Sequence, residues 1–435
     1  MPSVDVPVAL LGYGTVGAAV NRLLEEQGEE IERATGHRLR VVRALVRDAT
    51  KERGFEPASG VLTTDPADIL GDESIAIVAE VMGGVEPAGS HVLELLGSGR
   101  SVVTANKQLV ARRGAELFAA AATSGAQLRF EASVCAAIPV IKVLRESLVS
   151  TNVHRVVGIV NGTTNFVLSA MGDGRSYAEA LEEAQQLGYA EADPSDDVGG
   201  GDAAAKLAIL STVAFGSRVP LDWVEVEGIE GLTQEHVQAA RALDMKVKLL
   251  ARATLADGLV DARVGPAFVD VHHPLAAVEG PFNAVMLQGD AIREITLEGP
   301  GAGGIETASA VVADLVSIVG TSGTGFLQDD PVWRELERLP PGDLASPWYL
   351  RLTVDDRAGV LERLAHELAA EGVSVARLVQ QPVDGHATLH VVTHEAPAGR
   401  VERALAAIRS LPESRGGADA IPVVSERGVE ELGWA

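Results

Sequence analysis

The sequence predicts an α/β protein that begins with a doubly wound parallel sheet, continues into an α+β region and ends in a ferredoxin-like module. Three observations lead to this prediction. The apolar run at residues 6–11 leads directly into the glycine-rich turn GYGTVG. Apolar strands and helical segments then alternate as far as residue 131, which is typical of a parallel sheet. After residue 347 the pattern becomes β-α-β-β-α-β, the order of a ferredoxin-like fold.

The glycine-rich turn has the context of a dinucleotide-binding fingerprint. Three glycines follow an apolar strand and open a helix expected over residues 18–26. In this strand, turn and helix order, the pyrophosphate of a dinucleotide lies at the helix N-terminus. The sequence therefore predicts a nicotinamide cofactor bound by Gly12, Gly14, Thr15, Val16 and Gly17.

Two charged residues end the second expected strand, at residues 39–46. Arg47 can meet the 2′-phosphate of NADP, whereas Asp48 can bind the ribose diol of NAD. Both can equally be solvated charges of a loop. The choice between NADP and NAD stays open on these residues, with a slight preference for NADP.

The remaining pattern divides the chain into three domains and a linker. The first domain, residues 1–139, is completed by strands at residues 75–80, 101–104 and 127–131 and helices at residues 88–97 and 114–124. In the second, residues 140–320, strands are expected at residues 153–160, 247–254, 262–269, 283–288 and 294–298, and helices at residues 177–187, 203–215, 234–243 and 307–318. Residues 321–347 are rich in Gly, Pro and Asp and form a linker to the third domain, residues 348–426.

Composition limits the partners and the compartment. The 435 residues carry a net charge of -25, and nucleic acids and anionic membranes bind basic surfaces, so neither is an expected partner. A single cysteine excludes internal disulfides and fits a reducing compartment. No apolar run reaches the roughly 18 residues of a membrane helix, and no secretory signal is evident. We therefore expect a soluble cytoplasmic protein.

One pair of charges opens an apolar helix after three glycines. Asp202 and Lys206 are four residues apart and share a helix face, so the carboxylate can orient the ammonium group and keep it charged. A lysine held in this way can give a proton to a carbonyl oxygen. The alternative is an ordinary surface ion pair, but small residues surround the two and a loop dense in carboxylates precedes them.

Three motifs resemble those of homoserine dehydrogenase: TANK at residues 104–107, NGTTNF at residues 161–166 and LGYAEADPSDDVGGGDAAAKL at residues 187–207. The resemblance covers essentially the whole chain, because the C-terminal module, with DDRAGVL at residues 355–361, resembles an ACT domain that senses amino acids. It implies NAD(P)H-dependent, reversible reduction of L-aspartate 4-semialdehyde to L-homoserine in threonine, methionine and isoleucine biosynthesis. It also implies feedback inhibition by L-threonine and a homodimer or homotetramer.

The resemblance assigns roles to residues of the motifs. Lys206 is the expected proton donor, and Asp202 positions the reacting oxygen beside it. Lys107 is expected between nicotinamide and substrate, Glu191 at the substrate's α-ammonium group, and Asp197 as their support. Further cofactor contacts are implied for Thr104, Gly162, Gly303 and Glu306, of which the last two lie in or after a second glycine-rich loop, residues 299–304, that leads into a helix returning to the cofactor domain.

The segment EASVCAAIPVI, residues 131–141, resembles one that binds Na⁺ or K⁺ in some relatives. The implied ligands are the carboxylate of Glu131 and the backbone carbonyls of Val134, Ala136 and Ile138, and hard oxygen ligands suit such an ion. Cys135 and its two following alanines replace a glycine-rich version of this segment.

Two other functions stay open as alternatives. A semialdehyde dehydrogenase would use Cys135 as a thiolate nucleophile. An amino-acid-sensing regulatory protein would keep the N-terminal sheet without catalysis. The joint presence of Lys107, Glu191, Asp202 and Lys206 favours the dehydrogenase.

Overall fold

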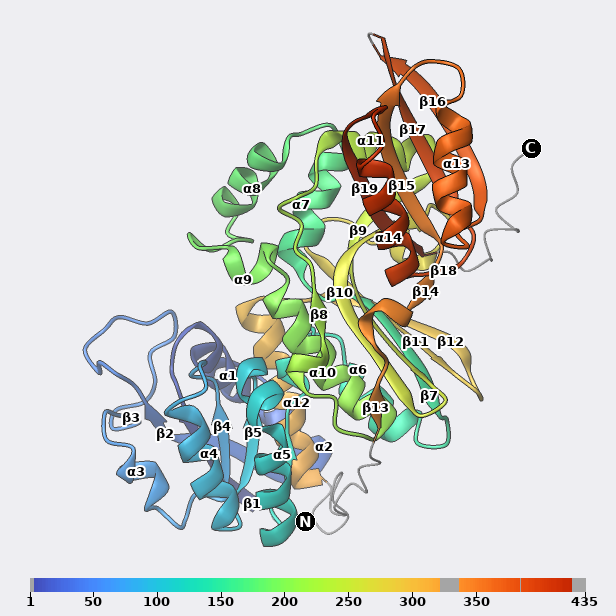
Figure 1. Cartoon of the computed structure of the whole chain (residues 1–435). Helices are drawn as coiled ribbons and strands as arrows, with labels where there is room; N and C mark the ends of the chain where they lie inside the picture. Colours follow the sequence, from blue (N-terminus) through green and yellow to red (C-terminus); the bar gives the residue numbers. More distant parts are fainter. Residues whose placement is uncertain (1–3, 321–335, 384, 425–435) are drawn as a thin grey trace. The chain divides into compact units, whose positions relative to one another are not determined.

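The computed structural model describes residues 4–320, 336–383 and 385–424, and these form two compact units (Figure 1). The first unit consists of Met1–Gly162, Asp202–Val224 and Phe282–Leu336, and the second of Thr163–Gly201, Glu225–Pro281 and Glu337–Ala435. Most of the expected linker, residues 321–335, and the expected end of the third domain, residues 425–426, lie outside the described residues.

A six-stranded parallel sheet forms the N-terminal part of the first unit. Its strand order is β3-β2-β1-β4-β5-β6, the order of a dinucleotide-binding Rossmann fold, which confirms the predicted fold class. The strands are β1 (Val4–Leu11), β2 (His37–Leu45), β3 (Leu62–Thr63), β4 (Ile77–Glu80), β5 (Ser101–Thr104) and β6 (Leu128–Arg129).

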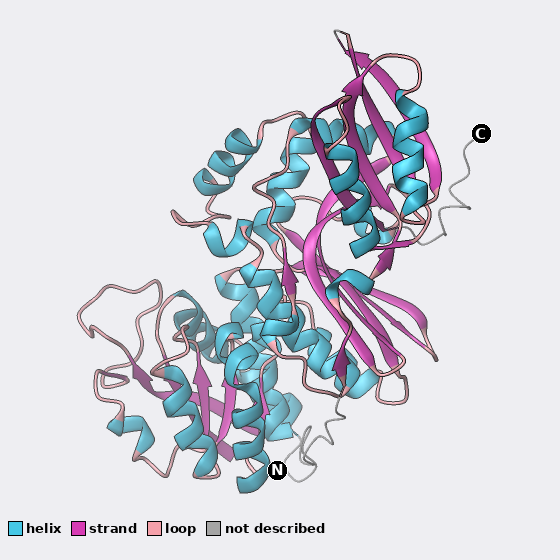
Figure 2. Cartoon of the chain, in the orientation of Figure 1, coloured by secondary structure: helices cyan, strands magenta, loops and turns pink. Residues whose placement is uncertain are grey.

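Helices cover both faces of this sheet (Figure 2). They are α1 (Thr15–Glu26), α2 (Gly28–Thr35), α3 (Ala67–Leu70), α4 (Ala88–Gly97), α5 (Lys107–Ser124) and the much later α12 (Gly304–Gly320). Val311 and Leu315 of α12 share one buried apolar cluster with Val8 and Leu10 of β1. The chain therefore returns to complete the core that its first strand begins.

The rest of the first unit contains an antiparallel sheet of β7 (Val153–Ile159), β11 (Phe282–Gly289) and β12 (Arg293–Pro300). It also contains the short helix α6 (Val140–Lys142) and the buried helix α10 (Gly201–Phe215). The first turn of α10 carries Asp202 and the next turn carries Lys206, the pair singled out in the sequence.

The second unit joins a long hairpin to the C-terminal module. The hairpin strands are β9 (Met245–Ala256) and β10 (Leu259–Asp270), and β10 pairs in parallel with β19 (Ser414–Val424). The module's sheet has the order β19-β15-β17-β16, with β15 (Trp348–Asp355), β16 (Val375–Val383) and β17 (His386–Thr393). Helices α13 (Val360–Ala370) and α14 (Ala398–Arg409) pack on one face through an apolar core that includes Leu350, Leu364 and Leu405. This is the predicted ferredoxin-like arrangement.

The other elements of the second unit are short. Four helices surround the hairpin, namely α7 (Gly162–Gly172), α8 (Tyr177–Gln186), α9 (Ser195–Val198) and α11 (Gln234–Ala242). The two-residue strands are β8 (Glu225–Val226), β13 (Glu337–Arg338), β14 (Ala345–Ser346) and β18 (Ala396–Pro397). Part of the predicted linker is therefore ordered as β13 and β14. None of the described helices is long and apolar enough to cross a membrane.

Two helices differ from the expectation in ways that affect the site. Helix α5 begins at Lys107 and not at residue 114, because the side chain of Asn106 accepts a hydrogen bond from the Leu109 amide and caps it. Helix α7 lies where the sequence analysis expected no helix. Thr163 and Thr164 have low helix propensity, but both are buried, and tertiary packing overrides that propensity.

We expect Gly17→Ala to destabilise the first unit, because a Cβ atom there would lie 2.4 Å from the Gly12 carbonyl oxygen. Such a clash typically costs about 1–3 kcal/mol. Gly14→Ala is the matched control, since nothing lies within 4 Å of its Cβ position. Urea unfolding of both variants measures the difference, and equal midpoints for the two would contradict this account of the turn.

Candidate active site

A carboxylate lies between two ammonium groups at the start of α10. The Lys206 Nζ is 2.9 Å from the Asp202 Oδ2, and the Lys107 Nζ is 2.5 Å from the Asp202 Oδ1. The Asn161 side-chain amide donates to Asp202 over 2.9 Å, and Lys206 also donates to the Val160 carbonyl over 2.7 Å. The structure thus brings Lys107, Asp202 and Lys206 together in the first unit.

The electrostatics of this cluster favour its charged form. Burial alone would raise the pKa of Asp202, which is 2% exposed, but the Lys206 and Lys107 ammonium groups hold it well below its ordinary range. Asp202 therefore stays ionised at neutral pH. Two ammonium groups and one carboxylate leave the cluster with a net positive charge, which suits it to polarise a carbonyl oxygen and then to supply a proton.

A buried glutamate organises the approach to Lys107. Glu80, at the end of β4, is fully buried and accepts hydrogen bonds from the Thr104 hydroxyl over 2.6 Å and the Met82 amide over 2.8 Å. Thr104 in turn accepts from the Asn106 amide, and Asn106 caps the helix that begins with Lys107. Burial raises the pKa of Glu80. Sequence reasoning missed this residue. The available signal was an acidic residue at the end of an apolar strand.

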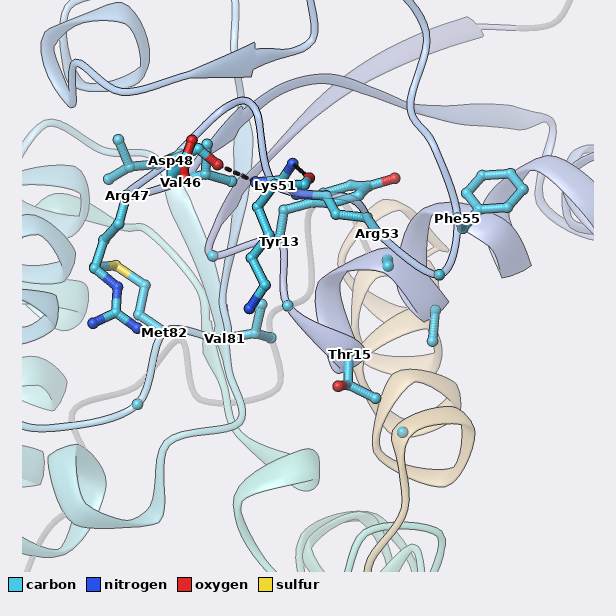
Figure 3. A pocket seen from close by; sticks show the side chains of 18 of the residues that line it. Tyr13, Thr15, Val46, Arg47, Asp48, Lys51, Arg53, Phe55, Val81 and Met82 are labelled. Atoms are coloured by element: carbon cyan, nitrogen blue, oxygen red, sulfur yellow. Dashed lines mark hydrogen bonds between the residues drawn. The ribbon is translucent and has the colours of Figure 1, made fainter.

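A cavity of about 1220 Å³ lies beside the glycine-rich turn (Figure 3). Gly12, Gly14 and Thr15 line it, as do Arg47 and the first residues of α12. The Cβ position of Gly14 is open, so a ligand can approach the backbone there. Val16, Gly17, Thr104, Gly303 and Glu306 do not line this cavity, although Gly304, next to Gly303, does.

Charged residues of both signs line this cavity. Arg47, Lys51 and Arg53 lie among them, together with Asp48 and Glu52. The carboxylate of Asp48 accepts hydrogen bonds from the amide and the hydroxyl of Thr50, over 2.8 and 2.7 Å. Asp48 thereby closes its own turn, and Arg47 and Lys51 supply positive charge beside it.

The loop that carries Glu191, Asp193, Asp196 and Asp197 is called the acidic loop below. It belongs to the second unit, as does all of α7 except its first residue. The Thr163 hydroxyl lies 3.2 Å from Asp197 and donates to the Tyr189 carbonyl over 2.5 Å. Glu191 has an exposed side chain, and its carbonyl accepts from Gln185 over 3.1 Å. Gly162, the last residue of the first unit's N-terminal segment, opens α7. Thr163 therefore joins the start of α7 to the acidic loop.

A buried lysine fixes α7 from the side. Lys248 of β9 is 2% exposed and donates to the Asn165 side chain over 3.0 Å, while the Asn165 amide donates to the Gly280 carbonyl over 2.9 Å. Sequence reasoning missed Lys248, although a lysine inside an apolar strand was the available signal.

The candidate cation segment turns sharply on itself. Both carboxylate oxygens of Glu131 accept backbone amides, from Ile141 and Lys142, each over 2.8 Å. Burial raises the pKa of Glu131 to about 7. The Ile138 carbonyl accepts from the Val140 amide. Over the described ranges, no three His, Cys, Asp or Glu side chains group as metal ligands, so any ion here would depend on one carboxylate and backbone oxygens.

Cys135 lies inside this turn with a positive φ of 55°. Its side chain is 1% exposed, and burial raises the pKa of its thiol to about 11. A thiolate nucleophile needs a lowered pKa and access to substrate. Cys135 has neither, which argues against the semialdehyde dehydrogenase alternative.

We expect Cys135 to resist alkylation by iodoacetamide at pH 8, because its thiol stays protonated below pH 11 and is buried. In urea the same thiol should react readily. Cys135→Ala should keep turnover within a small factor of the parent. Mass spectrometry counts the adducts, and rapid labelling of the folded protein with loss of activity would restore the nucleophile hypothesis.

Comparisons with known proteins agree with this geometry. The family model for the NAD-binding domain of homoserine dehydrogenase matches residues 12–131, the one for homoserine dehydrogenase matches residues 139–316, and the one for the ACT domain matches residues 348–413. The homoserine dehydrogenase of Mycobacterium tuberculosis (strain H37Rv) is 42% identical over 96% of this chain and 97% of its own length. That of Bacillus subtilis is 38% identical over 89% and 91%.

Solved structures give the same result. A homoserine dehydrogenase from Thiobacillus denitrificans superposes with a TM-score of 0.93 and 39% identity over 100% of both chains. A hyperthermophilic archaeal homoserine dehydrogenase in complex with NADPH superposes with a TM-score of 0.62 and 31% identity, over 72% of this chain and 97% of its own. With matches to both enzyme domains and to the ACT domain, the chain belongs to the homoserine dehydrogenase family of NAD(P)-dependent oxidoreductases.

Proposed function

We propose that this protein interconverts L-aspartate 4-semialdehyde and L-homoserine, in the biosynthesis of threonine, methionine and isoleucine. The observation that carries the proposal is the buried Asp202 carboxylate with the ammonium groups of Lys206 and Lys107 on its two oxygens. When bound, a nicotinamide cofactor would supply a hydride to the aldehyde carbon. Lys206 donates a proton to the aldehyde oxygen, which becomes the hydroxyl of homoserine, and then regains a proton from water.

The other residues of the motifs have supporting roles in this proposal. Lys107 steadies the carbonyl oxygen from its place at the carboxyl end of β5, where open α/β sheets bind ligands. Glu191 binds the α-ammonium group of the substrate, and Asp197 supports it through Thr163. Asp202 acts through the lysines, because its two carboxylate oxygens hold their ammonium groups in place.

The cofactor is proposed to be NADP. The carboxylate of Asp48, the residue that would bind a ribose diol, accepts hydrogen bonds from Thr50, whereas Arg47 and Lys51 line the cavity. Gly12, Gly14 and Thr15 would hold the pyrophosphate, and Gly162, Thr104, Gly303 and Glu306 remain proposed contacts of the nicotinamide half.

The proposal includes a Na⁺ or K⁺ ion that would organise the turn at residues 131–141. Glu131 and the carbonyls of Val134, Ala136 and Ile138 are the proposed ligands, and a bound cation would favour the ionised form of Glu131.

The C-terminal module is proposed to bind L-threonine, and the protein to act as a homodimer or homotetramer. In the DDRAGVL turn, Gly359 has a φ of 88° and an open Cβ position, so that a ligand can approach the backbone there. Threonine is a product made from homoserine, which makes it a chemically sensible inhibitor.

We expect Lys206→Met to lower kcat by roughly 10²–10⁴-fold, the usual contribution of a positioned acid or base. Binding of NADPH, followed by fluorescence titration, should be unchanged. Lys246→Met is the matched control, since it removes an ion pair with Glu279 that is exposed. Near-normal turnover in a folded Lys206→Met variant would remove this residue from the mechanism.

We expect NADPH to be preferred over NADH when oxidation is followed with aspartate semialdehyde. Arg47→Leu should raise the KM for NADPH by about tenfold or more, the typical effect of losing a charge-assisted contact, with little change for NADH. Arg33→Leu, an exposed arginine outside the cavity, is the control.

The same assay includes two further arms. Removal of monovalent cations should lower activity if the cation proposal holds. Added phosphate should not produce aldehyde oxidation. A phosphate-dependent oxidation would favour the semialdehyde dehydrogenase, and equal use of both cofactors by the parent and Arg47→Leu proteins would refute the Arg47 assignment.

We expect L-threonine to inhibit the full-length enzyme with a coupling of about 1–3 kcal/mol, as in ordinary allostery. Gly359→Leu should weaken inhibition, because its side chain would fill the open space at the turn. This variant is preferable to deletion of the module, because β19 pairs with β10 and its removal would leave Phe268 and Val269 of β10 without their strand partners. If threonine changes neither rate nor oligomeric state, another ligand must be sought.

A further inference from the structure

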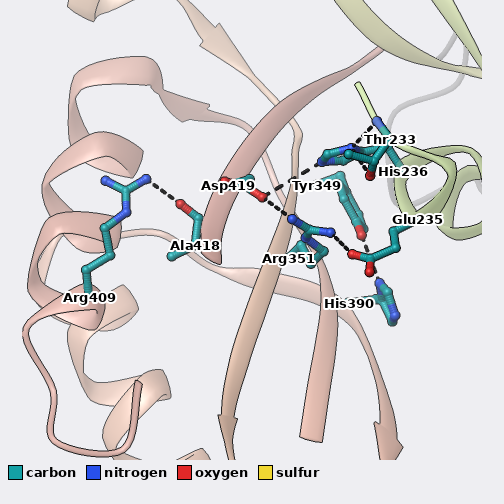
Figure 4. A network of polar contacts seen from close by, with 9 residues as sticks. All are labelled: Thr233, Glu235, His236, Tyr349, Arg351, His390, Arg409, Ala418 and Asp419. Atoms are coloured by element: carbon teal, nitrogen blue, oxygen red, sulfur yellow. Dashed lines mark hydrogen bonds and ion pairs between the residues drawn. The ribbon is translucent and has the colours of Figure 1, made fainter. Parts of the chain in front are cut away.

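The sheet of the C-terminal module is tied to helix α11 by an arginine (Figure 4). Arg351 of β15 donates to Asp419 of β19 over 2.7 Å and forms an ion pair with Glu235 of α11. Its side chain is only 16% exposed. Because one guanidinium group contacts both partners, it connects the module's sheet to the first turn of α11.

A buried histidine lies beside this connection. The Nδ1 of His236 accepts a hydrogen bond from the Thr233 amide over 3.1 Å, and its Nε2 lies 3.8 Å from Asp419. Beside it, Tyr349 stacks on Phe268 of β10 with ring centroids 4.6 Å apart. The module is therefore packed firmly against α11 and the hairpin.

The first residue of α11 makes the next contact. The side-chain amide of Gln234 donates to the Met171 carbonyl over 3.0 Å and also to the Arg175 carbonyl. The last carbonyls of a helix have no partner within it, and Met171 lies in the last turn of α7. Gln234 thus holds the C-terminal end of α7 from the side of α11.

The opposite end of α7 meets the acidic loop. Thr163, its second residue, contacts Asp197 and the Tyr189 carbonyl. Asn165, one half-turn later, is held by Lys248. A helix of this kind is a rigid element, so a displacement at Gln234 is transmitted along α7 to the loop that carries Glu191 and Asp197.

We propose that Arg351 and Gln234 are positioning residues of a connection through which the C-terminal module sets the acidic loop, by way of α11 and α7. That this loop binds substrate, and that the module binds an effector, rests on the proposed function. The connection itself is a property of the contacts within the second unit and is testable without either ligand.

The test is hydrogen exchange by mass spectrometry on the full-length protein without ligands. Arg351→Met should speed exchange by about fivefold in peptides covering residues 170–176 and 189–198, the size expected for the loss of one charged contact. Arg403→Met is the matched control, because it removes an exposed ion pair with Glu371 elsewhere on the module. Acceleration that stops at α11 would overturn the proposal.

Two further variants keep the test decisive. Glu235→Gln removes the same ion pair from an exposed helix position and serves if Arg351→Met fails to fold. Gln234→Leu should speed exchange in the same peptides, and Arg351→Met added to it should have no further effect there, as expected for two residues on one path. Additive effects would overturn the path through Gln234.

Kinetics separate this proposal from the proposed function. Gln234→Leu should raise the KM for aspartate semialdehyde by about five- to tenfold and leave the KM for NADPH unchanged. Arg351→Lys should change the KM for aspartate semialdehyde and the exchange rates less than Arg351→Met does, because it keeps the positive charge. If threonine does not change the enzyme's rate, the effector assignment is wrong, and the exchange result is unaffected. A normal KM in Gln234→Leu together with unchanged exchange at residues 189–198 would refute the connection while the dehydrogenase activity stands.

Discussion

The structure depends above all on a buried negative charge that needs two positive neighbours. Asp202 lies in the first turn of an apolar helix where an unpaired carboxylate would cost several kcal/mol. Lys206 follows it on the same helix, but Lys107 comes from the end of a separate parallel sheet. The ion cluster therefore fixes the N-terminus of α5 against that of α10, and the fold of the first unit has to satisfy this requirement.

Much of this arrangement could be predicted from the sequence because local rules decide it. The period of four residues places Asp202 and Lys206 on one face, and the glycine turn after an apolar strand predicts the parallel sheet. The order of elements after residue 347 predicts the C-terminal module. Each of these features can be predicted from a short stretch of neighbouring residues.

Contacts between distant segments could not be predicted in this way. Lys248 and Asn165 are far apart in the sequence, and so are Gln234 and the carbonyls of α7. Helix α7 itself was missed because Thr163 and Thr164 have low helix propensity, which their burial outweighs. The roles of Glu191, Asp197 and the cofactor contacts remain predictions, since they concern ligands and not the fold.

The pairing of β10 with β19 has a consequence for how the chain is made. Strand β10 leaves the ribosome long before β19, which closes its edge at Phe268 and Val269, is synthesised. During that interval the amides and carbonyls at this end of an apolar strand are unpaired and can pair with other nascent chains. The last strand of the sensor module is thus also a cover for the end of the hairpin, and the yield of folded protein should depend on chaperones that hold this end of β10 until synthesis is complete.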